Sequence, residues 1–244
     1  MNVLEHYASQ LDDLRKQGNL RQFTANIQMG RDIQINNRSM LNLSSNDYLG
    51  LAVDERLREE FFDLIPISEQ RMSSSSSRLL TGNFPEYEQL EHTLSQLFGN
   101  RSVLLFNSGY HMNIGILPAL CDSKTLILAD KLVHASLIDG MRLSTAQYVR
   151  YRHNDLNHLD ALLKKYQADQ TFERIIIVTE SIFSMDGDEA DLASLVALKK
   201  QYSNVMLYVD EAHAIGVRGK QGLGIVEQAA VIQEVDFIVG TFGK

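Results

Sequence analysis

The chain has 244 residues, 44% of them hydrophobic, which suits one large domain with a sizeable core. Its formal net charge of −8 argues against a nucleic-acid or membrane-surface binder, which would normally carry a basic patch. The single cysteine, Cys121, excludes disulfides within the chain and argues against a cysteine-based zinc site. The amino-terminal segment has no apolar core of a signal peptide, and no apolar run reaches the roughly 20 residues of a transmembrane helix. We therefore expect a cytoplasmic protein.

Two amphipathic helices are predicted in the first quarter of the chain. Apolar residues at helical spacing predict one helix over residues 2–17 and another over 54–65. Gly18-Asn19 ends the first helix. The side chains of the second helix that we expect to face inward are Leu57, Phe61, Leu64 and Ile65.

The first part of the chain also predicts the domain organisation. Two short strand-like pieces around Gly30-Arg31 indicate a small antiparallel appendage. The run of serines from Ser73 to Ser77 is interpreted as an ordered turn leading into a domain, with a flexible linker as the alternative. We expect an N-terminal helix and short strands over residues 1–50 and one large domain over 51–244.

From residue 100 onward, apolar strands alternate with helices. The predicted strands cover residues 102–106, 125–129, 146–150, 174–180, 205–211 and 236–241. The predicted helices cover 109–120, 134–143, a segment capped by Asn154 or Asp155, and 191–202. The run 175–178 is apolar without alternation, which is typical of parallel strands covered on both faces. The pattern therefore predicts an α/β fold with a mostly parallel central sheet flanked by helices.

Polar side chains occur where these strands end. Asp210 ends the strand VMLYV, and Lys244 follows the strand DFIVG through Thr241. Ligands of open parallel sheets bind at the carboxyl ends of the strands. A partly desolvated lysine is a nucleophile or base, and a buried aspartate suits a cationic ring nitrogen. The structural alternatives are a charged residue that merely follows a buried strand and an acid that caps the next turn.

The segment VDEAH, which contains Asp210, also looks like the magnesium-binding DEAH box of an ATPase. That interpretation needs a Walker A motif, G-x-x-x-x-G-K-[ST], before it, and no segment upstream of Asp210 matches. Gly219-Lys220 lies downstream, and it lacks the upstream glycine, as does Gly243-Lys244. We therefore disfavour an ATPase or helicase.

Other residues at the strand ends have two readings each. Gly109 and Tyr110 lie between a strand and a helix, where a glycine lets a phosphate approach backbone amides, although an ordinary turn explains it equally well. His134 opens a helix, either as a cap or as a ring that stacks on an aromatic cofactor. His153 and His158 are five residues apart and do not share a helix face, so we interpret them as structural. The candidates that fall at one edge of the sheet are Gly109, His134, Ser184, Asp210, His213, Thr241 and Lys244.

An ordered set of motifs carries a family resemblance. The motifs are SSNDYLG, SRLLTGN, FNSGYHMNIG, LVHASLIDG, HND, TESIFSMDGD, VDEAHAIGVRGKQGLG and TFGK. They cover nearly the whole chain, which resembles the α-oxoamine synthases, pyridoxal-phosphate enzymes of aspartate-aminotransferase (fold type I) architecture. The resemblance implies pyridoxal 5′-phosphate as the cofactor, and a smaller C-terminal domain that this sequence does not contain.

The resemblance also implies residue roles. Lys244 would bind the cofactor covalently and move the substrate α-proton, and Asp210 would pair with the pyridinium nitrogen. The implied catalytic residues are Lys244, His134 and Asp210. The implied cofactor-binding residues are Gly109, Tyr110, His134, Glu180, Ser184, Asp210, His213, Thr241 and Lys244. The implied substrate-binding residues are Arg21, Asn46 and His134, and no metal is expected.

The implied reaction is a decarboxylating condensation. L-Alanine would react with pimeloyl-CoA or a pimeloyl carrier protein to give 8-amino-7-oxononanoate, coenzyme A and carbon dioxide, a step of biotin biosynthesis. The alternative is 2-amino-3-ketobutyrate CoA ligase chemistry with glycine and acetyl-CoA, or another acyl-CoA. A non-catalytic domain on this scaffold is disfavoured because Lys244, Asp210 and His134 are all present. The family implies a homodimer with active sites at the subunit interface.

Two departures from the family pattern concern the substrate. Ser73–Ser77 stands where relatives are often richer in glycine, and Tyr87 stands where many have histidine.

Overall fold

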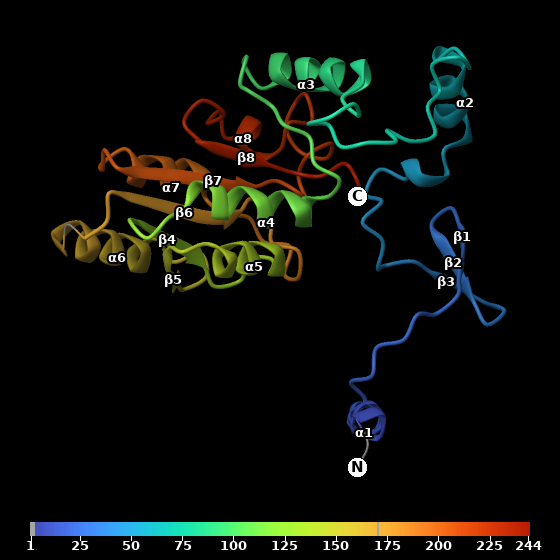
Figure 1. The fold of residues 1–244 in the computed structure, drawn as a ribbon, viewed down its shortest axis with the longest axis horizontal. Helices are drawn as coiled ribbons and strands as arrows, with labels where there is room; N and C mark the ends of the chain where they lie inside the picture. Colours follow the sequence, from blue (N-terminus) through green and yellow to red (C-terminus); the bar gives the residue numbers. More distant parts are fainter. Residues whose placement is uncertain (1–2, 170) are drawn as a thin grey trace. The chain divides into compact units, whose positions relative to one another are not determined.

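The computed structural model describes residues 3–169 and 171–244, and the chain divides into two compact units. The first unit reaches to Phe62, and the second runs from Asp63 to Lys244. The first unit contains helix α1 (Val3–Lys16), strands β1 (Ile27–Met29), β2 (Asp32–Ile35) and β3 (Arg38–Leu41), and the short 3-10 helix η1 (Leu51–Val53). The three strands form an antiparallel sheet in the order β1-β2-β3, which confirms the predicted antiparallel appendage (Figure 1).

Local sequence explains the tight connection between β2 and β3. Only Asn36 and Asn37 separate the paired residues Ile35 and Arg38, and both have positive φ, 49° and 61°. A two-residue hairpin turn with positive φ at both positions matches the twist of antiparallel strands, and asparagine tolerates that conformation.

Helix α2 (Glu55–Leu64) forms where the periodicity predicts it, but its expected inward face is not buried. Leu57, Phe61 and Leu64 are exposed, and Ile65 is only half-buried, so the prediction that they face inward is wrong. Helical spacing determines which side chains share a face, whereas burial needs a partner surface that spacing does not specify.

The second unit is built on a five-stranded parallel sheet (Figure 1). Its strands are β4 (Thr125–Asp130), β5 (Gln147–Tyr151), β6 (Arg174–Glu180), β7 (Val205–Asp210) and β8 (Phe237–Val239). Their order is β5-β4-β6-β7-β8, and every neighbouring pair is parallel. Every residue of β4 is buried, as are all but the first of β6, which confirms strands covered on both faces.

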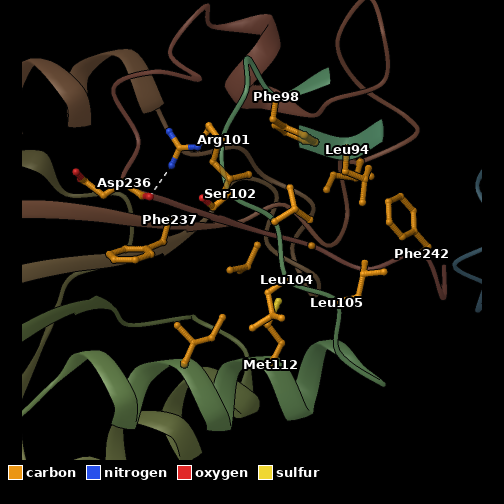
Figure 2. A pocket seen from close by; sticks show the side chains of 16 residues that line it. Leu94, Phe98, Arg101, Ser102, Leu104, Leu105, Met112, Asp236, Phe237 and Phe242 are labelled. Carbon is orange, nitrogen blue, oxygen red and sulfur yellow. Dashed lines mark hydrogen bonds between the residues drawn. The ribbon is translucent and has the colours of Figure 1, made fainter. Parts of the chain in front are cut away.

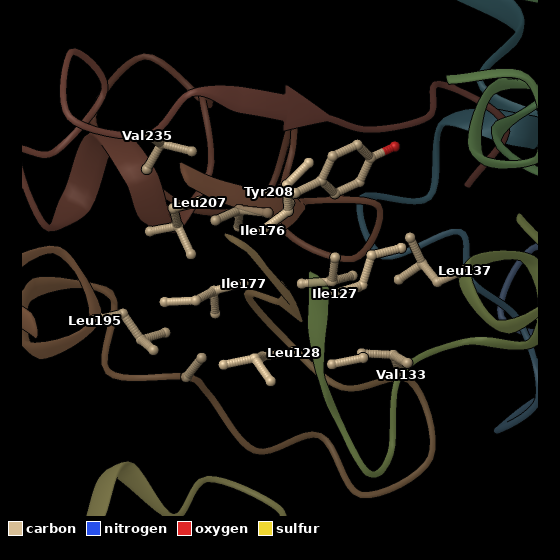
Figure 3. Close-up of a cluster of buried hydrophobic side chains, with 14 of the residues drawn as sticks. Ile127, Leu128, Val133, Leu137, Ile176, Ile177, Leu195, Leu207, Tyr208 and Val235 are labelled. Atoms are coloured by element: carbon tan, nitrogen blue, oxygen red, sulfur yellow. The ribbon is translucent and has the colours of Figure 1, made fainter. Parts of the chain in front are cut away.

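Helices of the second unit connect and cover the strands. They are α3 (Pro85–Leu97), α4 (Gly109–Leu120), α5 (Ala135–Leu143), α6 (Leu156–Asp169), α7 (Leu192–Lys199) and α8 (Ile225–Gln228). Helices α4 and α5 pack closely, and Gly140 permits this approach because a Cβ there would lie only 2.5 Å from the backbone oxygen of Asn113. The hydroxyl of Tyr208 in β7 donates to Oδ1 of Asn113 at 2.6 Å, which joins this helix pair to the sheet. Figure 3 shows Tyr208 and Leu137 in the same buried cluster as Ile127.

Residues 102–106 are not a strand, which corrects the predicted first strand of the alternating part. Arg101 donates to the carbonyls of Ile232 and Asp236, and the N–H of Leu105 donates to the carboxylate of Glu91. An apolar pocket lies between this extended segment and β8, the edge strand of the sheet (Figure 2). The apolar run shows that the segment meets a core, but a strand also needs a backbone partner.

His153 joins segments from three parts of the second unit. Its Nδ1 lies 2.9 Å from Oδ1 of Asp130, at the end of β4, and its Nε2 lies 2.7 Å from Oδ2 of Asp188. The ring also packs edge-on against Phe183, with centroids 4.5 Å apart. These contacts agree with the structural interpretation of His153.

Replacing His153 by glutamine is expected to remove a pH-dependent part of the stability. Desolvation lowers the pKa of His153, but the bonds to Asp130 and Asp188 outweigh it, so the net pKa is raised. The stabilisation is therefore full below the unfolded-state pKa of about 6.5 and is lost as the pH rises through the folded-state value. We expect His153→Gln to lower the free energy of unfolding by about 1–2 kcal/mol at acidic pH and by less at alkaline pH.

Denaturant unfolding measured between about pH 6 and about pH 8.5 checks this expectation. His92→Gln, on the exposed surface of α3, is the matched control. Its free energy of unfolding should differ little from that of the wild type at every pH. The same loss for His153→Gln across the whole range would contradict the ionic role.

Candidate functional site

A hollow lies at the carboxyl ends of the parallel strands, within the second unit. Its lining residues are Gly109, Tyr110, Asn113, His134, Ser136, Glu180, Asp210, Ala212, His213, Gly240, Thr241 and Lys244. All but one of the cofactor-binding candidates line it, although they come from distant parts of the sequence, from Gly109 to Lys244. Ser184 is the exception, and Arg21 and Asn46 belong to the first unit.

The N-terminus of α4 forms one wall of the hollow. Ser108 caps the helix, because its Oγ accepts the N–H of His111 at 3.1 Å. Across the residues that the structure describes, no acceptor is found for the backbone N–H groups of Gly109 and Tyr110. Free N–H groups in the first turn of a helix, together with its dipole, favour an anion. A Cβ added at Gly109 would lie 3.7 Å from Cβ of Thr241, so the two residues flank the same space.

Asp210 supplies a buried carboxylate to this hollow. It ends β7, is 6% exposed, and accepts Nδ2 of Asn113 at 3.0 Å and the N–H of Ala212 at 3.0 Å. Burial raises the pKa of Asp210, and these two hydrogen bonds oppose that shift. Such a carboxylate is best stabilised by a cationic partner, since burying an unpaired charge is costly.

Glu180 is a second buried carboxylate beside Asp210. It ends β6, and its Oε1 accepts the backbone N–H of His134 at 2.5 Å. Desolvation and the charge of Asp210 raise the pKa of Glu180 to about 7, although His134, Lys244 and the N–H of Ser184 favour the ionised form. Ser184 therefore contacts the site through Glu180, and its exposed side chain does not line the hollow.

Lys244 and His213 form a pair at the rim. Nζ of Lys244 lies 2.9 Å from Nε2 of His213. Desolvation, followed by the charges of Lys244 and His134, lowers the pKa of His213 to about 4. The neutral ring of His213 therefore accepts a hydrogen bond from the amine. Desolvation also lowers the pKa of Lys244, opposed by Asp210 and Glu180, which brings the amine closer to the neutral, nucleophilic form.

His134 caps α5 above the hollow. Its Nδ1 accepts the backbone N–H of Ser136 at 3.2 Å and lies 2.8 Å from Oγ of the same residue. Both readings of His134 made from the sequence are compatible with this geometry, because the residue caps the helix and also lines the hollow.

Four residues that line the hollow are not among the sequence-based candidates: Asn113, Ser136, Ala212 and Gly240. Of these, Asn113 and Ser136 have polar side chains. Asn113 falls on the second turn of α4, and its Nδ2 contacts both Asp210 and Ser136. An asparagine among the apolar residues that follow His111 in α4 is the available signal, because a buried amide needs hydrogen-bond partners.

The glutamate of VDEAH has a structural use. Glu211 is fully buried and accepts Oγ of Ser181 and the backbone N–H groups of Ile225 and Val226, at the start of α8. A Cβ at Gly224 would lie 2.5 Å from its carboxylate, so the loop closes tightly on Glu211. Because its oxygens are already occupied, Glu211 is not available as a magnesium ligand.

Residues 3–169 and 171–244, which the structure describes, contain neither a metal-binding cluster nor a membrane-spanning helix. No group of three or more histidine, cysteine, aspartate or glutamate side chains there is placed to hold a metal ion. No helix in that part of the chain is long and apolar enough to cross a membrane.

Comparison with known proteins gives the same family from sequence and from structure. Residues 38–244 match the family model described as aminotransferase class I and II. A relative from Pasteurella multocida, provisionally named 8-amino-7-oxononanoate synthase, is 59% identical over 99% of this chain and 62% of its own length. The chain thus spans somewhat less than two thirds of the curated relatives that it matches.

Two solved structures extend the comparison. Serine palmitoyltransferase from Sphingomonas wittichii is 30% identical, with a TM-score of 0.85 over 100% of this chain and 61% of that one. The 8-amino-7-oxononanoate synthase from Francisella tularensis is 28% identical, with a TM-score of 0.62 over 77% of this chain and 50% of that one. With the family model covering residues 38–244, these likenesses establish that the chain belongs to the aminotransferase class I and II family, whose enzymes depend on pyridoxal 5′-phosphate.

Proposed function

We propose that the hollow binds pyridoxal 5′-phosphate and that Lys244 is its covalent attachment point. The observation that carries this proposal is the convergence of three complementary groups in one hollow. They are the buried carboxylate of Asp210, the amine of Lys244 with its lowered pKa, and the free N–H groups at the start of α4. These groups match the ring nitrogen, the aldehyde and the phosphate of the cofactor, respectively.

The remaining groups of the hollow fit the same ligand. The backbone at Gly109 and Tyr110 and the hydroxyl of Thr241 would bind the phosphate. The ring of His134 would stack on the cofactor, and His213 would bind its hydroxyl. Glu180 and Ser184 would lie beside the ring.

Bound pyridoxal phosphate supplies an electron sink for negative charge at the α-carbon of an amino acid. Asp210 would hold the proton of the ring nitrogen, because a buried carboxylate gains from a cationic neighbour. Lys244 would take the α-proton of the substrate, for which a lowered pKa is an advantage at neutral pH. His134, stacked on the cofactor ring, would be the third catalytic residue.

For the reaction, we propose the decarboxylating condensation of L-alanine with a pimeloyl thioester, carried by coenzyme A or a carrier protein. The product would be 8-amino-7-oxononanoate, in biotin biosynthesis. The relative from Pasteurella multocida, with 59% identity, supports this choice. Arg21 and Asn46 would contact the acyl and amino-acid substrates, and two copies of the whole protein would form a homodimer with shared active sites in the cytoplasm.

Another α-oxoamine synthase reaction is the second candidate. The serine palmitoyltransferase structure with a TM-score of 0.85 supports it, because the shared fold serves a different amino acid and acyl group there. Glycine with acetyl-CoA is a further pair of this class. Coenzyme A release, measured with alanine and pimeloyl-CoA, with serine and palmitoyl-CoA, and with glycine and acetyl-CoA, decides between them.

Covalent cofactor binding is the direct test. The purified protein is expected to turn yellow with pyridoxal phosphate, and borohydride reduction should fix the cofactor on Lys244, as read by peptide mass spectrometry. Lys244→Ala should abolish both signals. Lys220→Ala, at an exposed lysine, is the matched control and should retain them. A wild-type protein that stays colourless and unlabelled would contradict the proposal.

A further inference from the structure

A chain of hydrogen bonds starts at Tyr208 and runs through residues that line the hollow. Tyr208 Oη donates to Oδ1 of Asn113 at 2.6 Å. Nδ2 of Asn113 donates to Oδ2 of Asp210 at 3.0 Å and to Oγ of Ser136 at 2.9 Å. Oγ of Ser136 lies 2.8 Å from Nδ1 of His134. Asn113, Ser136 and Tyr208 are each at most 2% exposed, so water does not replace these bonds.

The donors and acceptors of this chain can be arranged in one direction only. Flipping the amide of Asn113 would turn its oxygen toward the carboxylate of Asp210 and would leave both amide hydrogens facing Tyr208. Burial raises the pKa of Tyr208, so its hydroxyl keeps the proton that it donates. Ser136 then receives an N–H from Asn113 and has its own O–H left for Nδ1 of His134.

The consequence is a defined tautomer of His134. Nδ1 accepts the hydroxyl and the backbone N–H of Ser136, so in the neutral ring the proton lies on Nε2. The same amide that sets this tautomer also donates to Asp210. One buried side chain therefore donates to the acid and, through the hydroxyl of Ser136, favours the same tautomer that the backbone N–H of Ser136 favours.

We propose that Asn113 is a positioning residue that aims the carboxylate of Asp210 at the cofactor ring nitrogen and, through Ser136, keeps the ring of His134 in its Nε2–H form. This inference rests on the proposed binding of pyridoxal phosphate for its first half. The second half concerns the protein alone. Asn113 does not itself touch the reacting atoms in this proposal, because it acts through Asp210 and Ser136.

The alternative is that Asn113 merely fills the interface between α4 and the sheet. Removing it would then lower stability and would leave cofactor affinity, its pH dependence and the histidine tautomer unchanged in the folded fraction. A test therefore needs readouts that stability alone does not move.

The first test replaces Asn113 by leucine, whose side chain has the same number and branching of heavy atoms and no hydrogen-bonding groups. Loss of a hydrogen bond to a charged group is expected to weaken pyridoxal phosphate binding by about tenfold to a hundredfold. Equilibrium titration at a temperature well below unfolding measures it, with the melting temperature of the cofactor-free protein recorded in parallel. Unchanged affinity in the folded variant would overturn the part of the proposal that concerns Asp210.

Asn113→Asp provides a pH readout that a filling role would not produce. When the introduced carboxyl is protonated it donates to Asp210 as the amide does, whereas the ionised carboxylate repels Asp210. Cofactor binding by this variant should approach that of the wild type at acidic pH and should weaken as the pH rises, more steeply than in the wild type. Parallel pH profiles would contradict the proposal, and this variant also serves if Asn113→Leu does not fold.

The histidine tautomer is read without cofactor, by NMR of protein labelled in the histidine ring nitrogens. Wild-type His134 should show an unprotonated Nδ1, and Ser136→Ala and Asn113→Leu should reduce or abolish that preference. Tyr208→Phe removes only the bond to Oδ1 of Asn113 and should give a smaller change of the same sign. A wild type that binds no cofactor but shows this tautomer would refute the proposed function and leave the Asn113–Ser136–His134 link standing. An unaltered tautomer in Ser136→Ala would refute that link.

Discussion

In the proposed reaction, replacing Asp210 by asparagine is expected to slow coenzyme A release by two to four orders of magnitude. The carboxylate is buried at the end of β7 and lines the hollow, so an asparagine there would leave the ring nitrogen of the proposed cofactor complex without its counter-charge. Breaking one side of a buried ion pair costs about 3–5 kcal/mol, and each 1.4 kcal/mol is about a factor of ten in rate. Lys244 is untouched, so covalent attachment of the cofactor should persist.

The control for this prediction is Asp186→Asn. Asp186 lies in the exposed turn after β6 and does not line the hollow, so its replacement should leave the rate unchanged. Steady-state release of coenzyme A and borohydride labelling of Lys244 are measured for both variants. If Asp210→Asn keeps more than about a tenth of the rate, the ion pair contributes less than about 1.4 kcal/mol and the assigned role of Asp210 is wrong.

Replacing the neighbouring Glu211 by alanine is expected to lower stability strongly. The carboxylate accepts hydrogen bonds from Ser181, Ile225 and Val226, and all four residues are buried. The substitution leaves three donors without an acceptor, at about 1–3 kcal/mol for each unsatisfied group. Because the structure around the site relaxes, we expect the free energy of unfolding to fall by about 3–5 kcal/mol and the melting temperature to fall by roughly 10 °C.

Glu173→Ala is the matched control for Glu211→Ala. Glu173 pairs with Lys124 on the surface, and both side chains are at least 60% exposed, so the expected loss is below about 1 kcal/mol. Thermal and denaturant unfolding compare the two variants. A melting temperature of Glu211→Ala close to that of Glu173→Ala would show that the buried bonds of Glu211 contribute little, and would reopen a functional reading of VDEAH.

The parallel sheet and one edge of it could be predicted from local pattern. Apolar runs without alternation, such as 175–178, predict strands covered on both faces, and all four residues of this run are buried in the structure. Successive parallel strands end at the same edge, so Glu180, Asp210 and Lys244 could be expected to lie close together without coordinates. The free N–H groups of Gly109 and Tyr110 follow from their place in the first turn of the predicted helix over 109–120, although the segment before it is not a strand.

Other features depend on partners that are distant in the sequence. Residues 102–106 have the apolar composition of a strand, but a strand requires pairing with a neighbouring backbone, and the segment pairs with no strand among the residues that the structure describes. The inner face expected of α2 is exposed for a related reason. Helical spacing determines which side chains share a face, but it does not determine which surface covers that face.

The division between Asp210 and Glu211 also required the structure. The two acids are adjacent in VDEAH, and nothing in that motif says which one faces a ligand. A strand points successive side chains to opposite faces, so one turns to α4 and the hollow while the other turns to the start of α8. Asn113 was missed for the same reason, because its partners Asp210 and Ser136 lie 97 and 23 positions away. Periodicity acts between near neighbours and identifies strands, helices and strand ends, whereas hydrogen-bond partners across elements are chosen by three-dimensional packing.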